Sequence, residues 1–311
     1  MKQTTKTILQ VLFISIYGIT IGYSQMPNYP MKAENAALNY TDLENFAFAF
    51  SKMDKKSDTI KLLQEHYFDK ASIGLKEYIS RHGLTPVMLK RSIKKYPKVY
   101  AEIPQFIENL PTFKGKLTTV LKKFGTIVPK TMYAPTYLLV GANRGIAQAS
   151  KHGQLVTIGR VLKNEKTLLK LIVHELSHFQ QVKTLGGPKY IGLYSKPNNM
   201  LELCLREGGA EFITKQVLNN ITQEKSLSYF NKNEKKLKLQ FLKDLKTQDN
   251  SFWLWKSIGN KNHPQLLGYV MGYKIWEHYY SISNKKEEVI AEVLGLVDAE
   301  QYITKSGYFK N

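Results

Sequence analysis

The chain has 311 residues, of which 43% are hydrophobic and 23% charged, and its formal net charge is +20 at pH 7. The hydrophobic fraction is ordinary for a globular protein, and the length suits one large domain or two smaller ones. Cys204 is the only cysteine, which excludes an intramolecular disulfide. The charge favours anionic partners, such as lipopolysaccharide at the cell envelope, acidic peptides or nucleic acid. The lysines are nevertheless spread along the chain, a pattern typical of a solvated surface, so no specific nucleic-acid site is expected.

The first 25 residues have the pattern of a secretory signal. Lys2 and Lys6 make a basic start, an apolar run extends from Ile8 to Ile21, and residues 22–25 suit cleavage. The run is short for a membrane span, and no second segment of spanning length follows. We therefore expect a signal peptide over residues 1–25 and a soluble mature chain, periplasmic or secreted, without a lipid-attachment cysteine or a transmembrane segment.

Residues 26–130 are expected to form a helical N-terminal region. After a loose linker to about residue 40, apolar residues recur at helical spacing over 43–132. Thr85 before Pro86 predicts a helix cap followed by proline in the first turn. This region shows no spacing typical of metal ligands or of a nucleophile.

The pattern changes near Thr136, where a catalytic domain over 131–311 is expected to begin. The apolar run 137–141 predicts a buried strand, and 154–159 predicts a second one. A helix then starts near Asn164. This order places a sheet edge beside the helix, and we expect the 154–159 strand to hold an extended peptide substrate.

The remainder of the chain is predicted to be mostly helical. A loop is expected from Gly186 to about residue 199. The apolar cluster Phe252–Trp255 is expected to lie in the core or to form a pocket wall. The expected helices are one from about residue 200, an amphipathic helical hairpin over 224–247, and two helices over 266–280 and 285–294. The fold class is thus α+β and mostly helical, with a small sheet packed on the helix that starts near Asn164.

That helix contains the sequence His174-Glu175-Leu176-Ser177-His178. Residues four apart lie on one face of a helix, so His174 and His178 can bind one metal ion. Glu175 is rotated away from the pair but can reach a water on the metal. Two nitrogen ligands and a carboxylate base suit a zinc hydrolase. The apolar residues before the motif indicate a buried helix, where these polar side chains would be costly without a metal.

A catalytic zinc ion usually has a third protein ligand. Glu207 and Glu211 lie one turn apart in Glu207-Gly-Gly-Ala-Glu211, and either could be that ligand. If Glu207 is the ligand, Glu211 could orient a histidine ligand through a hydrogen bond. The two glycines would let the motif helix approach closely. His152 precedes the second strand and is expected to be a loop histidine rather than a ligand.

The Glu-Gly-x-Ala segment after His-Glu-x-x-His resembles the gluzincin peptidases, and distantly the aminopeptidase N catalytic domain. This resemblance implies a thermolysin-like catalytic domain with Glu207 as the third zinc ligand. Tyr269-Val-Met-Gly272 is similar to the Tyr-x-Lys-Gly of those enzymes, which implies that Tyr269 stabilises the oxyanion. The two middle residues depart from that pattern, and Tyr273, one helical turn later, is the alternative donor.

A closer resemblance covers most of the mature chain. The segment from Tyr137 to Gly159, the Glu-Gly-x-Ala-Glu segment and the run 267–275 resemble an uncharacterised family of predicted zinc-dependent proteases. That family is frequent in Bacteroidota and is related to gliding-motility lipoprotein B. The chain lacks that lipoprotein's attachment cysteine and an aminopeptidase-type exopeptidase motif, so neither membrane anchoring nor aminopeptidase specificity is implied.

The sequence therefore predicts an exported metallopeptidase that binds Zn²⁺ through His174, His178 and Glu207. Glu175 is the expected general base for a zinc-activated water, with a peptide or protein as substrate. One alternative is a non-catalytic binding or scaffold protein at the envelope, stabilised by its metal. Another is a zinc hydrolase of a non-peptide amide or ester.

Overall fold

The computed structural model describes residues 29–143, 147–159, 162, 164–197, 199–247, 250–255 and 263–310. The expected signal peptide lies outside these residues. The described chain divides into two compact units, one with residues 29–187 and 213–222, the other with 188–212 and 223–310. The expected boundary near residue 130 stays a prediction. No helix of the described part is both long and apolar enough to cross a membrane.

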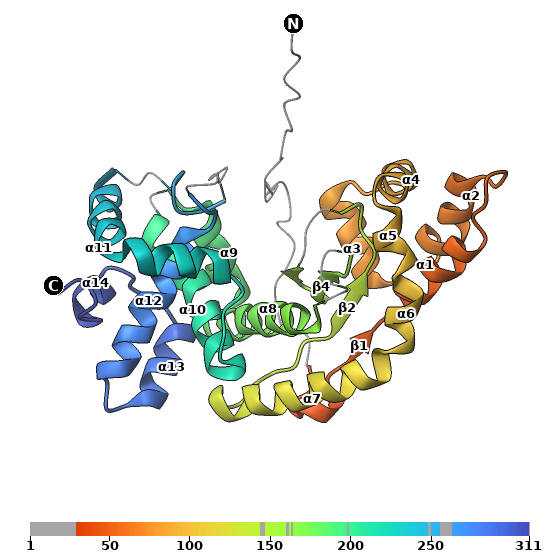
Figure 1. The fold of residues 1–311 in the computed structure, drawn as a ribbon. Helices are drawn as coiled ribbons and strands as arrows, with labels where there is room; N and C mark the ends of the chain where they lie inside the picture. The colour runs from red at the N-terminus through yellow and green to blue at the C-terminus, as the bar shows by residue number, and fades with distance from the viewer. Residues whose placement is uncertain are drawn as a thin grey trace, which may run out of the picture. The chain divides into compact units, whose positions relative to one another are not determined.

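The first unit contains a small sheet, whose four described strands lie in the order β1-β2-β4-β3 (Figure 1). β1 pairs parallel with β2, β2 parallel with β4, and β3 antiparallel with β4. The strands are β1 (Leu38–Asn39), β2 (Thr136–Leu139), β3 (Ala147–Ser150) and β4 (Gly153–Thr157). The fold class predicted from the sequence, α+β and mostly helical with a small sheet, is confirmed.

The strand expected to hold a peptide substrate is in the interior of this sheet. β4 is hydrogen-bonded on both sides, to β2 and to β3, so a further strand cannot add to it. The expectation for residues 154–159 is therefore wrong, and β3 is the strand at that edge. Local sequence does not reveal this order, because the short loop after residue 150 folds β3 back onto the outer side of β4.

Gly153 makes this β3–β4 hairpin possible. Its φ is +137°, and a Cβ there would lie 2.3 Å from the Pro135 carbonyl oxygen, so only glycine fits without strain. The Ser150 hydroxyl donates to the Gly153 carbonyl oxygen at 2.9 Å. The turn thus brings β3 beside the helix that follows β4.

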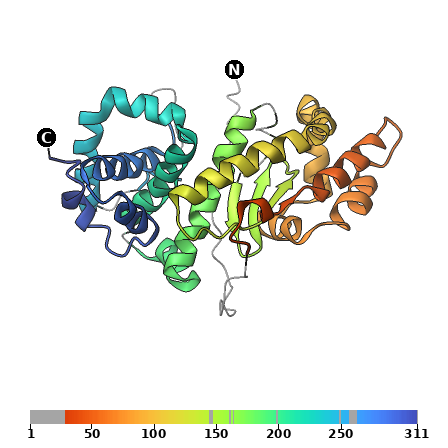
Figure 2. The same ribbon diagram turned by 90° about the horizontal axis from the view of Figure 1, so that it is seen from below.

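Several helices lie between β1 and β2 in the chain (Figure 2), and two of them, α1 (Thr41–Ser51) and α3 (Ile73–His82), pack against one face of the sheet. Thr85 caps one of them, because its hydroxyl accepts from the Met88 backbone N–H at 3.2 Å and Pro86 begins the helix, as the sequence predicted. The elements are α1 (Thr41–Ser51), α2 (Thr59–Leu63), η2 (Gln64–Phe68), α3 (Ile73–His82), α4 (Pro86–Lys95), α5 (Pro97–Ala101), α6 (Ile103–Glu108) and α7 (Leu110–Ile127), after the single turn η1 (Ala33–Asn35).

Two buried tyrosines tie these helices to the end of β2. The Tyr67 hydroxyl donates to the Val140 carbonyl oxygen at 2.8 Å and accepts from its N–H at 3.0 Å. Tyr100 donates to the Gly141 carbonyl oxygen at 3.0 Å. The backbone groups just beyond the strand are therefore satisfied away from water.

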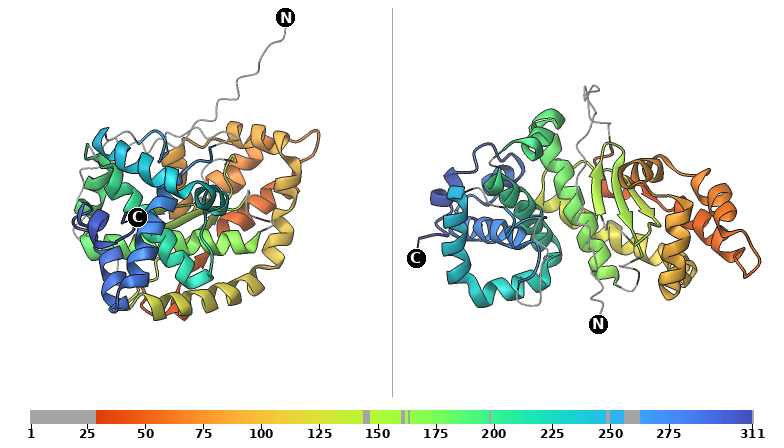
Figure 3. Two further views of the ribbon diagram at one scale, coloured as in Figure 1. Left: turned by 60° about the vertical axis from the view of Figure 1, so that its left-hand side comes forward. Right: turned by 90° about the horizontal axis from the view of Figure 1, so that it is seen from above.

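The motif helix α8 (Glu165–Leu185) packs against the other face of the sheet, along β3 and β4 (Figure 3). The Asn164 side chain accepts from the Thr167 N–H at 3.0 Å and so caps the helix. Near the other end, Gln180 accepts from the Met132 N–H at 3.0 Å and donates to its carbonyl oxygen at 2.8 Å. α8 is thereby held against the segment that enters β2.

The second unit is helical in its described part. The loop expected after Gly186 is in fact largely the helix α9 (Gly187–Ser195), which Pro188 can begin because the first turn needs no backbone N–H there. The others are α10 (Met200–Leu218), which runs into the first unit at its end, α11 (Glu224–Thr247), α12 (Leu267–Ile282), α13 (Lys286–Leu294) and α14 (Gln301–Lys305). α11 consists of two helical segments that meet at a kink at Asn233, where φ is −125° and ψ is 15°.

Candidate metal centre

His174 and His178 lie on one face of α8, and both side chains are buried. Their Nε2 atoms are 3.1 Å apart, and the rings are at 81° to each other. Two nitrogens about 2.0–2.1 Å from one tetrahedral zinc ion would be about 3.3 Å apart. The observed separation therefore fits a pair of imidazoles that share a metal ion.

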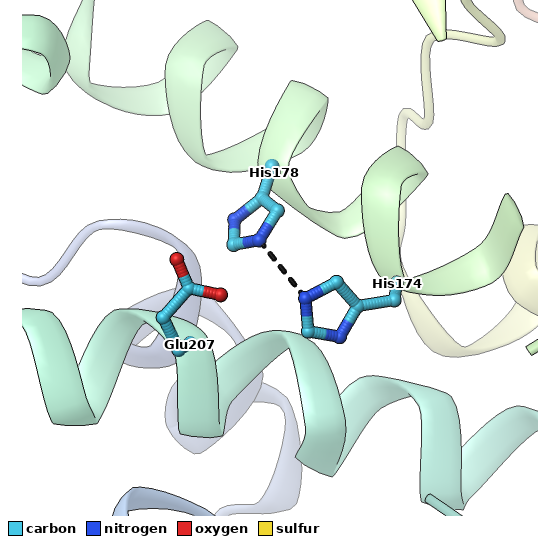
Figure 4. Close-up of side chains that lie close together, drawn as sticks. All are labelled: His174, His178 and Glu207. Atoms are coloured by element: carbon cyan, nitrogen blue, oxygen red, sulfur yellow. Dashed lines mark hydrogen bonds between the residues drawn. The ribbon is translucent and has the colours of Figure 1, made fainter. Parts of the chain in front are cut away.

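Glu207 on α10 supplies a carboxylate to the same point (Figure 4). One ligand atom each from His174, His178 and Glu207 lies within 4.8 Å of the others, and all three residues are buried. Within the described residues, Glu207 rather than Glu211 is the carboxylate of this group. Two neutral nitrogens and one carboxylate are a donor set that zinc takes at catalytic sites. The residues present thus fit the metal, although each one's role as a ligand stays a prediction.

Glu175 follows the first histidine on α8, and its side chain is 8% exposed. The helical rotation between neighbours turns it away from the imidazole pair, as the motif requires of a base that is not a ligand. A buried carboxylate is costly unless it has partners or a positive charge nearby. Its burial therefore agrees with a position beside a metal site, and its catalytic role stays a prediction.

Two tyrosines of α9 lie beside Glu207. The Tyr194 hydroxyl donates to Glu207 Oε1 at 3.5 Å, and the Tyr190 and Tyr194 hydroxyls are 3.0 Å apart. Burial raises the pKa of Tyr194 well above its ordinary value, and the nearby Tyr190 and Glu207 raise it further. Tyr194 is therefore a neutral donor that can orient the Glu207 carboxylate. Neither tyrosine could be predicted from the sequence, because the pattern after Gly186 indicates a loop there.

The ring of His178 also has a partner on its own helix. Gln181 is fully buried, and its Oε1 lies 2.9 Å from His178 Nδ1. This residue was not predicted from the sequence either. The available signal was a polar residue three positions after a ligand candidate, a spacing that brings side chains together on a helix.

The glycine after Glu207 lets two helices of the second unit cross closely. A Cβ on Gly208 would lie 2.2 Å from the Gly272 carbonyl carbon, and a Cβ on Gly272 would lie 1.8 Å from the Cys204 carbonyl oxygen. The close approach at Gly208 is to α12, and the approach of the motif helix expected from the sequence stays a prediction. Cys204 is buried, and burial raises the pKa of its thiol further above its ordinary value, so it acts as a small apolar residue.

α12 carries the two tyrosines considered as oxyanion donors. The Trp255 indole N–H donates to the Tyr269 hydroxyl oxygen at 2.9 Å. The Tyr273 hydroxyl donates instead to the carboxylate of Glu277, and burial and this carboxylate raise its pKa strongly. The hydroxyl of Tyr273 is thus bound to a carboxylate, and the role of either tyrosine as oxyanion donor stays a prediction.

The remaining side chains singled out from the sequence lie elsewhere. His152 is in the β3–β4 turn, 4.0 Å from a Glu77 carboxylate oxygen, as expected for a loop histidine. Trp253 is fully buried and packs edge-on against Phe241, so this part of the apolar cluster belongs to the core.

Comparison with known proteins identifies a family. Residues 51–287 match the model of the family described as "Putative zinc dependent peptidase (DUF5700)". The matched range includes both histidines and Glu207. No match was found among curated proteins or solved structures. Zinc is accordingly the metal that both the family and the donor set indicate.

Proposed function

The chain belongs to this family of zinc-dependent peptidases, and on that premise we propose that it is an exported zinc metallopeptidase of the gluzincin type. His174, His178 and Glu207 would hold the zinc ion. The observation that carries the proposal is the buried group of two imidazole nitrogens and a carboxylate, with Glu175 next to the first histidine.

Zinc, when bound, makes a water molecule more acidic and polarises the carbonyl group of a substrate. The Glu175 carboxylate accepts a proton from the attacking water as the water oxygen bonds to the scissile carbonyl carbon. It then delivers that proton to the amine nitrogen as the carbon–nitrogen bond breaks. The products are a carboxylic acid and an amine, and Glu175 returns to its ionised form.

Tyr269 is the proposed donor to the oxyanion that develops on the carbonyl oxygen. The Trp255 N–H occupies an acceptor position of its hydroxyl, so the tyrosine's own proton points away from the indole. A tyrosine held in this way can donate without reorienting, which is the property that oxyanion stabilisation needs. Tyr273 remains the alternative, although its proton is directed at Glu277.

We further propose that the protein works outside the cytoplasm, periplasmic or secreted, near an anionic surface of the cell envelope. The pattern of residues 1–25 motivates the compartment, and the support for an anionic partner is the exposed side of α11. Exposed lysines recur there at helical spacing around Leu239, which is 66% exposed: Lys232, Lys235, Lys236, Lys243 and Lys246. Two acidic residues of the helix point inward, where Tyr308 donates to Glu234 and Trp253 to Asp244. The exposed face is therefore strongly basic.

Co-sedimentation with vesicles containing phosphatidylglycerol tests this surface. The triple variant Lys235→Glu/Lys236→Glu/Lys243→Glu should lose most of its vesicle binding. The matched variant Lys90→Glu/Lys94→Glu/Lys95→Glu changes three exposed lysines of α4 and the net charge by the same amount, and should lose much less. Equal losses would mean that total charge, not α11, determines the binding.

The proposed reaction is tested with Glu175→Gln and a proteome-derived peptide library. The wild-type protein should cleave peptides and stop after chelation. Glu175→Gln should keep its zinc but lose cleavage by several orders of magnitude, because the proton acceptor is gone. Zinc binding without cleavage by the wild type would support a metal-stabilised binding protein instead. Turnover restricted to non-peptide amides or esters would indicate the other hydrolase class.

A further inference from the structure

Gln181 is a fully buried amide one helical turn after His178. Its Oε1 lies 2.9 Å from Nδ1 of that histidine, the ring nitrogen on the far side from the candidate metal position. Burying an amide costs free energy unless its polar atoms find partners. An apolar residue would fill this position on α8 more cheaply, so a polar one there calls for a reason.

The contact determines which ring nitrogen of His178 carries the proton. An amide oxygen only accepts hydrogen bonds, so Nδ1 must be the protonated nitrogen. Nε2 is then the unprotonated nitrogen, which carries a lone pair. That lone pair belongs to the atom 3.1 Å from His174 Nε2. Figure 4 shows the two rings beside Glu207, and one ligand atom of each of the three residues lies within 4.8 Å of the others.

We propose that Gln181 is a positioning residue of the zinc site. It fixes the Nδ1–H tautomer and the ring plane of His178, so that Nε2 faces the metal before the metal arrives. The inference rests on the zinc site of the proposed function, but not on peptide cleavage. Pre-orientation of this kind raises the affinity of a metal site, since the unbound ligand has fewer arrangements to lose.

The neighbouring glutamine provides the rigid support that this role needs. Gln180 binds both backbone polar groups of Met132 and so fixes this turn of α8 against the segment entering the sheet. Gln181 starts from that fixed turn and reaches back to the ring. The two adjacent glutamines therefore have different tasks: Gln180 holds the helix in place, and Gln181 holds the ligand.

Two substitutions separate this role from simple filling of space. Gln181→Leu has a similar volume but no acceptor, and should weaken zinc binding by about 10–100-fold in competition with a chelator. Gln181→Glu keeps an acceptor at both oxygens and should bind zinc at least as tightly as the wild type. Ser177→Ala is the matched control. Ser177 is equally buried on α8, but its hydroxyl donates to the Val173 carbonyl oxygen, so its loss should leave zinc affinity unchanged.

A second measurement reads the tautomer directly. Long-range ¹H–¹⁵N spectra of the zinc-free protein at mildly alkaline pH should show His178 protonated at Nδ1, and the Gln181→Leu spectrum should show a mixture. If the wild type is protonated at Nε2, or if Gln181→Leu binds zinc as the wild type does, the proposal is wrong. Should Gln181→Leu fail to fold, Gln181→Glu and the wild-type spectrum still decide.

These results are independent of the proposed activity. A wild type that binds zinc tightly but cleaves no peptide would refute the proposed function and leave Gln181 as a positioning residue. A wild type that binds zinc no better than His174→Ala would refute both.

Discussion

Replacing Gly208 with alanine should separate α10 from α12 and destabilise the protein. The added Cβ would lie 2.2 Å from the Gly272 carbonyl carbon and 2.3 Å from the Tyr273 nitrogen. Both are backbone atoms of a helix, so no side-chain rotation can relieve the clash. Overpacking of this kind costs about 1–3 kcal/mol. At about 2–4 °C for each kcal/mol, the melting temperature should fall by roughly 2–12 °C.

The matched control is Gly115→Ala in α7. Nothing lies within 4 Å of a Cβ at Gly115, and the residue is exposed in mid-helix, where alanine is favoured by about 0.5–1 kcal/mol. Thermal unfolding followed by circular dichroism should therefore show opposite shifts for the two variants. If Gly208→Ala has the same melting temperature as the wild type, the close crossing of α10 and α12 is refuted.

Further predictions concern the metal and the oxyanion donor. Removing zinc with a chelator should lower the melting temperature, and added zinc should restore it, because a ligand bound only to the folded state stabilises that state. Tyr269→Phe should lower kcat by about 10²–10³-fold with little change in KM, whereas Tyr273→Phe should have a much smaller effect. Trp255→Phe should fall between them, since it removes the donor that orients Tyr269 but leaves the tyrosine hydroxyl. Equal losses for the two tyrosine variants would contradict this assignment.

The parts of the site that follow from local spacing could be predicted from the sequence. His174 and His178 are four residues apart on a buried helix, and helix geometry alone brings their rings together. The third carboxylate could not be chosen in this way. Glu207 and Glu211 share a helix face and are both buried, so only the resemblance favoured Glu207. The distances that group it with the histidines depend on tertiary packing.

The hydrogen-bond partners of these side chains could not be predicted from the sequence, for a different reason. Tyr194 lies on α9, a short helix that begins at glycine and proline, residues that usually indicate a loop. Gln181 has the right spacing from His178, but that spacing is common on helices and specifies no contact. Such hydrogen bonds are specific only once the surrounding helices are packed.

The sheet shows the same limit at the level of topology. Residues 153–157 form a strand close to where the pattern indicated one. Its interior position depends on β3 folding back on one side and on β2 pairing on the other, and these are non-local choices. The partner of Gly208 could not be predicted for the same reason, since a glycine indicates close approach without identifying the element that approaches.

Zinc content and peptide cleavage, measured together on the wild type and Glu175→Gln, test the central claim most directly. The account predicts about one zinc ion per chain in both proteins and cleavage by the wild type alone. Cleavage by zinc-loaded Glu175→Gln at the wild-type rate would contradict it.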